Sequence, residues 1–486
     1  MRRALVVAML GLLLPPFGVA AEARHAKRRP RTRHGDGAGS GTEAAEGPRT
    51  EAVPAEGRAT PQATPTPGQP TDGWVPPLVR ENRVTQQHYD ALRSAAPRIY
   101  VYNLPPDVRG DQCAPHGAYS LEVDLPDTLR ENGFTVDDPA TADFFWVPAL
   151  TYCTHKNVLA RPGGADIPAW NYTSVYIDGV VRELRRQGPH WDEQPHRHVF
   201  VWPADHGFCG FGPKEPGVAQ VRESIGISHW GLTKREMGGP HAAACLPQGL
   251  PCHVPGKDIV VPTPNDYVDM QKMKPSTEAD DSNRTTLLFF AGNSGVELTR
   301  GSGTGTHYSH GVRGLIFMMF NDTAKFPRMK LVKRAPDDEF YHSVFCLAPS
   351  GGGYGIRLFK MMYFGCIPVI VQDDIRQAYD DLLPYRKFAI VLRSHKLARL
   401  RQYLGRAEAK KEPYFAALRE HRASLFWEFD GVVPSYPGKA LLRLFESLNA
   451  RKTRRREDNA SPCGDQSTGQ YVPDDVLDSE RGGDFP

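Results

Sequence analysis

The amino-acid sequence predicts an α/β protein with two domains, each built on a mostly parallel sheet. The chain has 486 residues, which exceeds the roughly 250 to 300 residues at which single hydrophobic cores stop growing. Apolar residues make up 40% of the chain and aromatic residues 10%, enough to fill two cores. Short β-branched and aromatic runs alternate with helix-like segments, and this alternation restarts after about residue 266.

The N-terminus has the composition of a targeting segment. Two arginines precede an unbroken apolar run over residues 4–14, the length of a signal-peptide core. We expect residues 1–23 to be a signal peptide or a signal anchor; a full membrane span needs about 20 apolar residues, so both alternatives stay open. Residues 24–95 are rich in Pro, Gly and Thr and predict a disordered stem.

The first predicted domain covers residues 96–265. β-Rich runs predict strands and the segments between them predict helices. The expected strands lie within residues 98–105, 142–150, 198–207 and 257–264, and the expected helices within 119–132 and 174–187. The Gly, Pro and His residues that follow the third strand predict a long irregular stretch.

The second predicted domain covers residues 266–450, and a disordered tail is expected over 451–486. Its densest segment, residues 345–374, has the pattern of a strand, a glycine turn, a helix and a buried strand. The other expected strands lie within residues 286–295, 330–333 and 387–392, and the expected helices within 311–321, 337–344, 397–406, 414–429 and 439–451.

Charge and sequence motifs limit the partners and indicate the compartment. The net charge is only +3, and the visible basic excess lies in terminal runs, so no nucleic acid is expected as a partner. Asn171, Asn283 and Asn321 begin sequons for N-glycosylation, which suit a protein of the secretory pathway.

The chain has eight cysteines, a number that suits an oxidising lumen. Their pairing does not follow from the sequence. Cys245 and Cys252 are close enough in sequence to close a small loop. Cys346 and Cys366 lie in apolar runs, and we expect them to be buried free thiols.

Two glycine turns predict an anion site in the second domain. Ser350, Gly351 and Gly353 lie between a strand and a helix, where backbone amides are able to face phosphate oxygens, and Arg357 lies in the first turn of that helix. Gly292 lies in a similar turn after another buried strand. That turn leads toward Arg313, for which a solvated position on a helix face is the alternative to a bidentate diphosphate clamp.

The order of these motifs resembles the exostosin family, glycosyltransferase family 47. The segments FCLAP, the glycine turn and GCIPVIVQDD carry the resemblance, preceded by YVYNLP, ADFFWVP, KDIVVP and LLFFAG, so that it spans roughly residues 97 to 445. The resemblance implies a GT-B architecture, two Rossmann-like domains facing across a cleft. It also implies an inverting transfer from a UDP-sugar bound by the second domain to a glycan acceptor on the first.

Such enzymes generally stabilise the leaving diphosphate with side chains, so the resemblance requires no metal, although a role for Mn²⁺ stays open. Gly292, Arg313 and Arg357 match the donor-binding role. Many family members carry an acidic residue in the helix that follows the motif arginine, where it binds the donor ribose. This chain has Lys360 there, which leaves charge beside the phosphates or a solvent-facing position as alternatives.

Asp205 and His206 are the first candidates for the catalytic base that deprotonates the acceptor. They follow a buried strand of the first domain, at the carboxyl end where open α/β sheets hold ligands. A second possibility is that Asp205 only caps the next glycine turn. Asp373 and Asp374 occupy the equivalent place in the second domain and suit ligand positioning or loop capping better.

The predicted function is therefore transfer of a sugar from a UDP-sugar to a polysaccharide or glycoprotein glycan in the Golgi lumen. The membrane is a partner only through the N-terminal segment, which gives a type II anchored protein if uncleaved and a secreted one if cleaved. The alternative is a non-catalytic, glycan-binding or chaperone-like protein with the same fold, which the lysine at position 360 permits. It would bind glycans without affinity for UDP.

Overall fold

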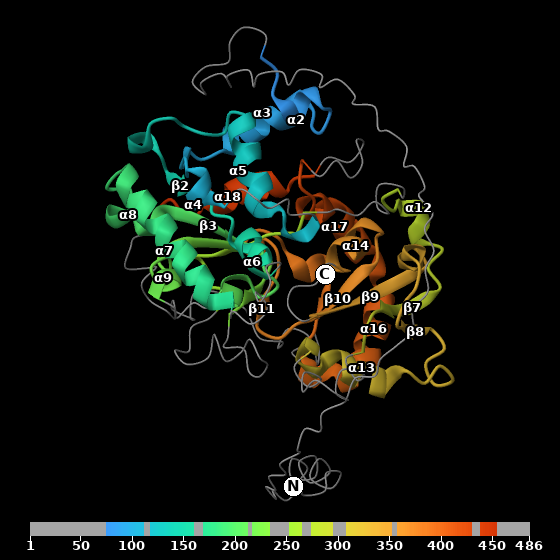
Figure 1. Ribbon diagram of the computed structural model, residues 1–486. Helices are drawn as coiled ribbons and strands as arrows, with labels where there is room; N and C mark the ends of the chain where they lie inside the picture. Colours follow the sequence, from blue (N-terminus) through green and yellow to red (C-terminus); the bar gives the residue numbers. More distant parts are fainter. Residues whose placement is uncertain are drawn as a thin grey trace, which may run out of the picture. The chain divides into compact units, whose positions relative to one another are not determined.

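The computed structural model describes residues 74–110, 117–159, 169–211, 216–233, 252–264, 274–294, 308–351, 357–429 and 438–453. All of them belong to one compact unit of the chain, Pro65–Pro486. The described residues form two five-stranded sheets, with helices between and around them (Figure 1). Residues 1–73, which include the predicted signal segment 1–23 and most of the predicted stem, lie outside the described residues, and so do residues 454–486, Cys245 and Gly353. The expectation of a disordered tail over 451–486 is wrong at its first residue, because Arg451 is buried and donates hydrogen bonds to the carbonyls of Lys257 and Asp258.

The first sheet is entirely parallel and has the strand order β1-β2-β3-β4-β6. Its strands are β1 (Ile99–Val101), β2 (Phe144–Trp146), β3 (His198–Trp202), β4 (Ile225–Ser228) and β6 (Ile259–Val260). The carboxyl ends of parallel strands meet at one edge, which is where open α/β sheets hold ligands. The residues that follow β1 to β4 therefore define one of the two candidate surfaces.

The second sheet is also parallel and has the strand order β12-β10-β9-β7-β8. Its strands are β7 (Thr286–Ala291), β8 (Met329–Val332), β9 (Ser343–Pro349), β10 (Ile367–Val371) and β12 (Ile390–Val391). Two parallel sheets with helical connections confirm the predicted α/β fold of two Rossmann-like parts. The exact domain boundaries at residues 265 and 450 stay predictions.

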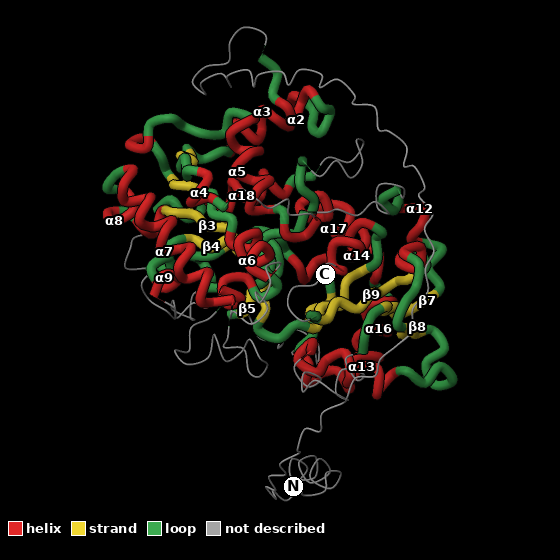
Figure 2. The backbone as a smooth tube through the Cα atoms, viewed as in Figure 1, coloured by secondary structure: helices red, strands yellow, loops and turns green. Residues whose placement is uncertain are grey.

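Helices connect the strands in both parts, and Figure 2 shows how they alternate with strand and loop. The α-helices are α2 (Pro77–Arg80), α3 (Gln86–Ala95), α4 (Pro106–Arg109), α5 (Leu121–Glu131), α6 (Thr151–Leu159), α7 (Ala169–Gln187), α8 (His190–Glu193), α9 (Pro216–Ala219), α12 (Glu278–Asp281), α13 (Val312–Phe320), α14 (Arg357–Tyr363), α15 (Tyr385–Phe388), α16 (Leu400–Glu408), α17 (Lys411–His421) and α18 (Ala440–Asn449). Among the helices that the structure describes, none is both long and apolar enough to span a membrane.

Strand β3 shows how the first sheet is covered on both faces. Val199 and Val201 pack into a core that includes residues of α3, α5 and α18. Phe200 and Trp202 point the other way, into a core with residues of α7. Side chains alternate between the two faces along a strand, so a strand apolar at every position must be buried on both sides.

The two sheets share a hydrophobic core and a short piece of antiparallel sheet. The core that contains Val199 continues into α14 and α18. Strand β5 (Gly231–Leu232) pairs with β11 (Ile375–Arg376). A Cβ on Gly231 would lie 2.4 Å from the carbonyl oxygen of Arg376, so this pairing requires a glycine. Trp427 adds a hydrogen bond from Nε1 to the Pro262 carbonyl at 3.0 Å.

Part of the predicted stem is folded. The expectation of disorder over residues 24–95 is wrong for α2 and α3, because Leu78, Tyr89 and Leu92 are buried in the main core. The apolar residues of α2 and α3 are few and separated by polar ones, so these helices resemble the stem in composition.

Two further expectations differ from the structure. Strand β4 lies in the stretch expected to be irregular, and residues 337–344 form a 3₁₀ turn (Asp337–Phe340) and the start of β9 rather than one helix.

The cysteine expectations were also wrong. Cys346 and Cys366 form a disulfide between β9 and the residue before β10, instead of remaining free thiols. Cys252 pairs with Cys209, which is far away in sequence. Both pairs depend on which strands are neighbours, a long-range property that local sequence does not report.

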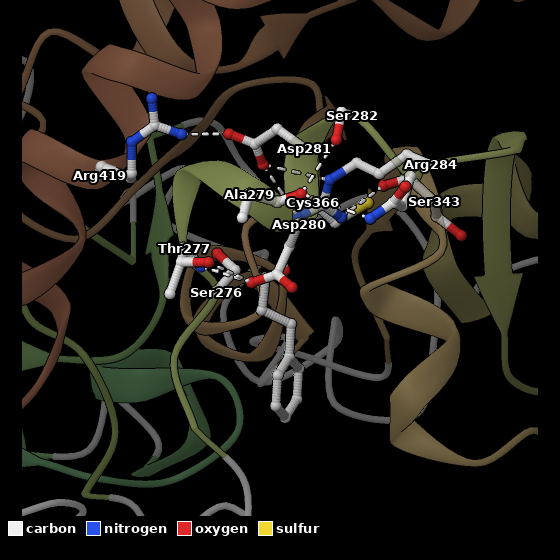
Figure 3. A network of polar contacts seen from close by, with 12 residues as sticks. Ser276, Thr277, Ala279, Asp280, Asp281, Ser282, Arg284, Ser343, Cys366 and Arg419 are labelled. Carbon is white, nitrogen blue, oxygen red and sulfur yellow. Dashed lines mark hydrogen bonds and ion pairs between the residues drawn. The ribbon is translucent and has the colours of Figure 1, made fainter.

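A polar network around Arg284 closes the amino end of the second sheet (Figure 3). The Arg284 side chain is fully buried. Its Nη1 donates to the carbonyls of Phe340 and Ser343, both at 2.8 Å, and its Nη2 donates to that of Phe364 at 3.0 Å. Asp281 accepts from Arg284 at 3.3 Å and also binds Arg419. One guanidinium thus binds the backbone carbonyls of several segments that meet at the amino end of the second sheet.

Replacing Arg284 by methionine should destabilise the protein by about 3 to 5 kcal/mol, because it leaves buried carbonyls and Asp281 without their donor. The exposed Arg401, which lies over the ring of Phe326, is the matched control, and Arg401→Met should change stability by less than about 0.5 kcal/mol. Urea unfolding of both variants measures the difference. Equal stabilities would show that the network contributes little.

Candidate functional site

The predicted donor residues come together at the carboxyl edge of the second sheet. Arg357 opens α14 and donates from Nε to the carbonyl of Ala291, the last residue of β7, at 2.9 Å. Arg313 lies on α13 and donates from Nε to the Ser350 carbonyl at 2.9 Å and from Nη1 to the Asn293 carbonyl at 3.3 Å. These contacts fix both arginines relative to the turns that follow β7 and β9.

Phe290 lies beside both cations. The Arg313 guanidinium carbon lies 5.4 Å from its ring centroid and that of Arg357 lies 5.1 Å from it. Cation–π contacts of this kind are worth about 0.5 to 2 kcal/mol and suit arginine more than lysine. Arg313 is only 2% exposed, so the alternative of a solvated surface arginine is wrong. Its two backbone contacts join the turn at Asn293 to the turn at Ser350.

Gly292 allows Arg357 to lie against the backbone. A Cβ added to Gly292 would lie 2.4 Å from Nη2 of Arg357 and 3.0 Å from Cζ of Phe290. Any side chain at this position would displace the guanidinium. The glycine predicted from the turn motif therefore has a second function, which is to admit the arginine.

The turn at Ser350 is also fixed from the other side. Ser350 is buried, and the carbonyl of Gly351 accepts a hydrogen bond from the Ser309 amide at 2.8 Å. Ser309 has a left-handed backbone with φ of 58°, which a serine rarely adopts. Backbone strain of this kind persists only where the surroundings enforce it.

Lys360 does not face solvent but pairs with an acidic residue. Its Nζ is 2.6 Å from Oδ2 of Asp337, and both side chains are about one-fifth exposed. The expectation of a solvent-facing lysine is therefore wrong. The ion pair joins α14 to the 3₁₀ turn before β9, so the positive charge of Lys360 is balanced within the protein.

Asp205 and His206 lie after β3, at the carboxyl edge of the first sheet. Asp205 is exposed and accepts a hydrogen bond from the Tyr119 hydroxyl at 2.8 Å. The amide of Gly207 donates instead to the carbonyl of Ala204. The His206 ring packs edge-on against Trp230, with centroids 6.1 Å apart.

A small cavity lies beside Trp230, where the two parts of the chain meet. Its lining includes Trp230 from the first part of the chain and Leu358 and Phe359 from α14, the two residues that follow Arg357. The same Trp230 contacts His206. The cavity thus lies where Trp230 meets α14, the helix that carries Arg357.

Asp373 and Asp374 have contacts typical of loop capping. The Asp373 carboxylate accepts from the Ser394 amide at 3.0 Å. Asp374 accepts from Nη1 of Arg393 at 3.0 Å, and its carbonyl accepts from the amide of Thr233 at 2.9 Å. Asp374 also has a left-handed backbone, with φ of 59°. These contacts order the loop that enters β11.

A buried carboxylate supports the acceptor side. Glu122, on α5, accepts hydrogen bonds from the Thr151 hydroxyl at 3.0 Å and from the amides of Tyr152 and Cys153 at 3.1 and 2.9 Å. It therefore caps the first turn of α6. Burial raises the pKa of Glu122 to about 7, although the three hydrogen bonds act in the opposite direction.

The predicted sequons lie in different settings. Asn283 follows α12 and Asn321 follows α13, and both are exposed. Asn171 lies near the start of α7. Their glycosylation stays a prediction.

The family follows from the sequence comparison. A family model described as the Exostosin GT47 domain matches residues 93–406. The chain belongs to this family. The predicted family and enzyme class, a glycosyltransferase, are thereby confirmed.

The relatives of this exostosin-family chain include plant transferases. It is 24% identical to a "probable glucuronosyltransferase" of Oryza sativa subsp. japonica over 368 residues, 73% of this chain and 80% of the relative. It is 25% identical to a "probable glucuronoxylan glucuronosyltransferase" of Arabidopsis thaliana over 377 residues, 74% of this chain and 77% of the relative. Among solved structures, Anabaena HepE in complex with UDP-glucose matches 72% of this chain and all of that chain, with 11% identity and a TM-score of 0.32.

Several residues of the candidate site were not predicted from the sequence. Tyr119 and Trp230 flank Asp205 and His206, and Phe290 lies beside both arginines. Phe290 was visible only as part of an apolar strand. Trp230 lies two residues after β4, whose glycine and the following histidine made the strand hard to predict, so the run Ile-Gly-Ile-Ser-His-Trp was the one available signal.

The buried Glu122 should make stability depend on pH. Because its pKa is higher in the folded state than the ordinary value of 4.5, the folded protein holds the proton more tightly, and stability falls as pH rises from about 4.5 to above 7. Glu122→Gln should remove this part of the pH dependence, on the order of 3 kcal/mol. Urea unfolding from pH 4 to pH 8 measures it.

The side chain of Glu446, which lies on α18, is 35% exposed and pairs with Arg443. Glu446→Gln serves as the control and should keep the slope of the original protein. Asp380, whose pKa burial raises to about 6, adds a slope of the same sign that all three proteins retain. An identical pH dependence in Glu122→Gln and the original protein would contradict the assignment.

Proposed function

We propose that this protein transfers a sugar from a UDP-sugar to a polysaccharide or glycoprotein glycan, with inversion at the anomeric carbon. The observation that carries the proposal is the pair of arginines fixed beside Phe290 at the carboxyl edge of the second sheet. A leaving diphosphate develops negative charge, and cations that are already fixed in place stabilise it without reorganisation. The names of the plant relatives support transfer to a polysaccharide.

In this proposal each donor-side residue has a distinct task. Arg357 faces the diphosphate, since it opens α14 and Gly292 admits its guanidinium against the turn. Arg313 positions the site, because it joins the turns at Asn293 and Ser350 through their carbonyls.

Asp205 is proposed as the base for the acceptor hydroxyl. The Tyr119 hydroxyl donates to Asp205 Oδ1, which orients the carboxylate. An inverting transfer needs a base that takes the proton as the acceptor oxygen attacks the anomeric carbon, while the bond from that carbon to the diphosphate breaks. His206 is the neighbouring candidate, beside Trp230 at the cavity.

The Golgi lumen is the proposed location, with the N-terminal segment as a type II anchor or a cleaved signal. The apolar run at residues 4–14 supports entry into the secretory pathway. The disulfides Cys209–Cys252 and Cys346–Cys366 suit an oxidising compartment, and the exposed sequons at Asn283 and Asn321 suit the same route.

A second candidate function is glycan binding without catalysis. The ion pair between Lys360 and Asp337 favours this candidate. Lys360 lies in the part of α14 where many members of the exostosin family carry an acidic residue that binds the donor ribose. This alternative requires glycan affinity without UDP affinity. The nucleotide titration below separates the two.

Calorimetric titration of the full chain with UDP and a panel of UDP-sugars, with and without Mn²⁺, tests the proposal. We expect saturable UDP binding, and Arg357→Ala should weaken it about 10- to 100-fold because a charge-assisted contact is lost. The absence of any UDP binding at millimolar concentration would replace the enzyme with the glycan-binding alternative.

A pair of glycine variants tests the role of Gly292. Gly292→Ala should weaken UDP binding at least tenfold, since its Cβ would overlap Nη2 of Arg357. Gly405→Ala is the control, because a Cβ there meets nothing within 4 Å. It lies in α16 and should stabilise the protein by up to about 1 kcal/mol with unchanged UDP affinity. Equal UDP affinities in the two variants would argue against the arginine's role.

A further inference from the structure

Two tyrosines stack face to face at the carboxyl edge of the first sheet. The ring centroids of Tyr119 and Tyr152 are 4.1 Å apart and the rings are 9° from parallel. Tyr119 lies between β1 and α5, and Tyr152 lies in the first turn of α6, which follows β2. Both rings are half-buried, unlike Phe144, Trp146 and Phe200 within the sheet.

This tyrosine pair is attached to the proposed base. The Tyr119 hydroxyl donates to Asp205, which follows β3, at 2.8 Å. Residues that follow three neighbouring parallel strands thus meet in one cluster, at the edge where such sheets hold ligands. Lys156, one turn along α6, lies with its Nζ 5.4 Å from the centroid of the Tyr152 ring.

Glu122 fixes the backbone of Tyr152. Its carboxylate is buried and accepts hydrogen bonds from the amides of Tyr152 and Cys153 and from the Thr151 hydroxyl. A buried carboxylate is costly to desolvate, and its hydrogen bonds offset only part of that cost. This carboxylate holds in place the turn of α6 that carries Tyr152.

We propose that Tyr119 and Tyr152 form a subsite for the glycan acceptor, with Glu122 as a positioning residue. The inference rests on the proposed function and assigns the acceptor side of that reaction. The apolar face of a pyranose ring packs against aromatic rings, while its hydroxyls bind carboxylates and ammonium groups. The cluster offers aromatic rings, the carboxylate of Asp205 and the ammonium of Lys156.

The charge of the cluster favours a sugar over a nucleotide. An exposed carboxylate beside the rings repels phosphate groups, whereas it accepts hydrogen bonds from sugar hydroxyls. The guanidinium groups suited to a diphosphate, Arg313 and Arg357, lie on the second sheet. The two substrate classes are thereby assigned to different carboxyl edges.

The subsite is tested by acceptor binding to the full chain. An array of β-linked oligosaccharides that includes xylohexaose and cellohexaose identifies the glycan bound best, and calorimetry then measures its affinity. Tyr152→Ala should weaken glycan binding at least tenfold and leave UDP affinity unchanged, whereas Tyr152→Phe should retain both. Tyr100→Phe, on β1, is the matched control.

Tyr119→Phe tests the link to Asp205 without removing the ring. Loss of the hydroxyl should lower kcat at least tenfold while the acceptor KM changes less than threefold, a separation that a merely structural role would not produce. Glu122→Gln should raise the acceptor KM with an unchanged donor KM. Glu446→Gln should change neither constant.

The outcomes distinguish this inference from the proposed function. Unchanged glycan affinity in Tyr152→Ala, or no glycan bound by a protein that binds UDP, would overturn the subsite while leaving the donor site intact. If the original protein binds glycans in a Tyr152-dependent way but no UDP, the transferase proposal fails and the glycan subsite stands. If Tyr152→Ala does not fold, the kcat and KM values of Tyr119→Phe decide.

Discussion

The arrangement of the site depends on the junction between the two sheets. β5 pairs with β11 directly after Trp230 and directly after the loop of Asp374, so residues from both carboxyl edges are held by one pair of short strands. Gly231 makes the pairing sterically possible. Cys209, Trp230, Leu232, Cys252 and Ile375 pack together around it, with the Cys209–Cys252 disulfide inside the cluster. A shift of this junction would move the acceptor side against the donor side.

Both edges use the same physical arrangement, a polar side chain fixed by hydrogen bonds to backbone groups. On the second sheet, carbonyls of Ala291, Asn293 and Ser350 hold two guanidinium groups. On the first sheet, amides of α6 are held by the carboxylate of Glu122. Long side chains lose conformational entropy when they bind a substrate, and anchoring them in advance reduces that cost. The fold therefore orders these side chains before the substrates bind.

Sequence patterns predicted the strands well, because most are short apolar runs bounded by turn residues. They predicted Gly292 and Arg357 as residues in or beside glycine turns, but not that the glycine admits the arginine, since that contact joins a turn and a helix that are distant in sequence. The burial of Arg313, the pairing of Cys346 with Cys366 and the partner of Lys360 are likewise long-range properties. Local composition also led to the wrong prediction of disorder at α3, whose few buried residues, Tyr89 and Leu92, are surrounded by polar ones.

Family membership indicates the class of reaction more firmly than it indicates how this particular chain binds its donor. The ion pair of Lys360 with Asp337 is internal and neutral, so it neither adds charge at the phosphates nor supplies an acidic ligand for ribose. Donor affinity would then come mainly from the diphosphate, through Arg357. Such a site would bind the nucleotide without strong selection for its ribose. Selection among donors would then depend on contacts to the sugar rather than on contacts to the ribose.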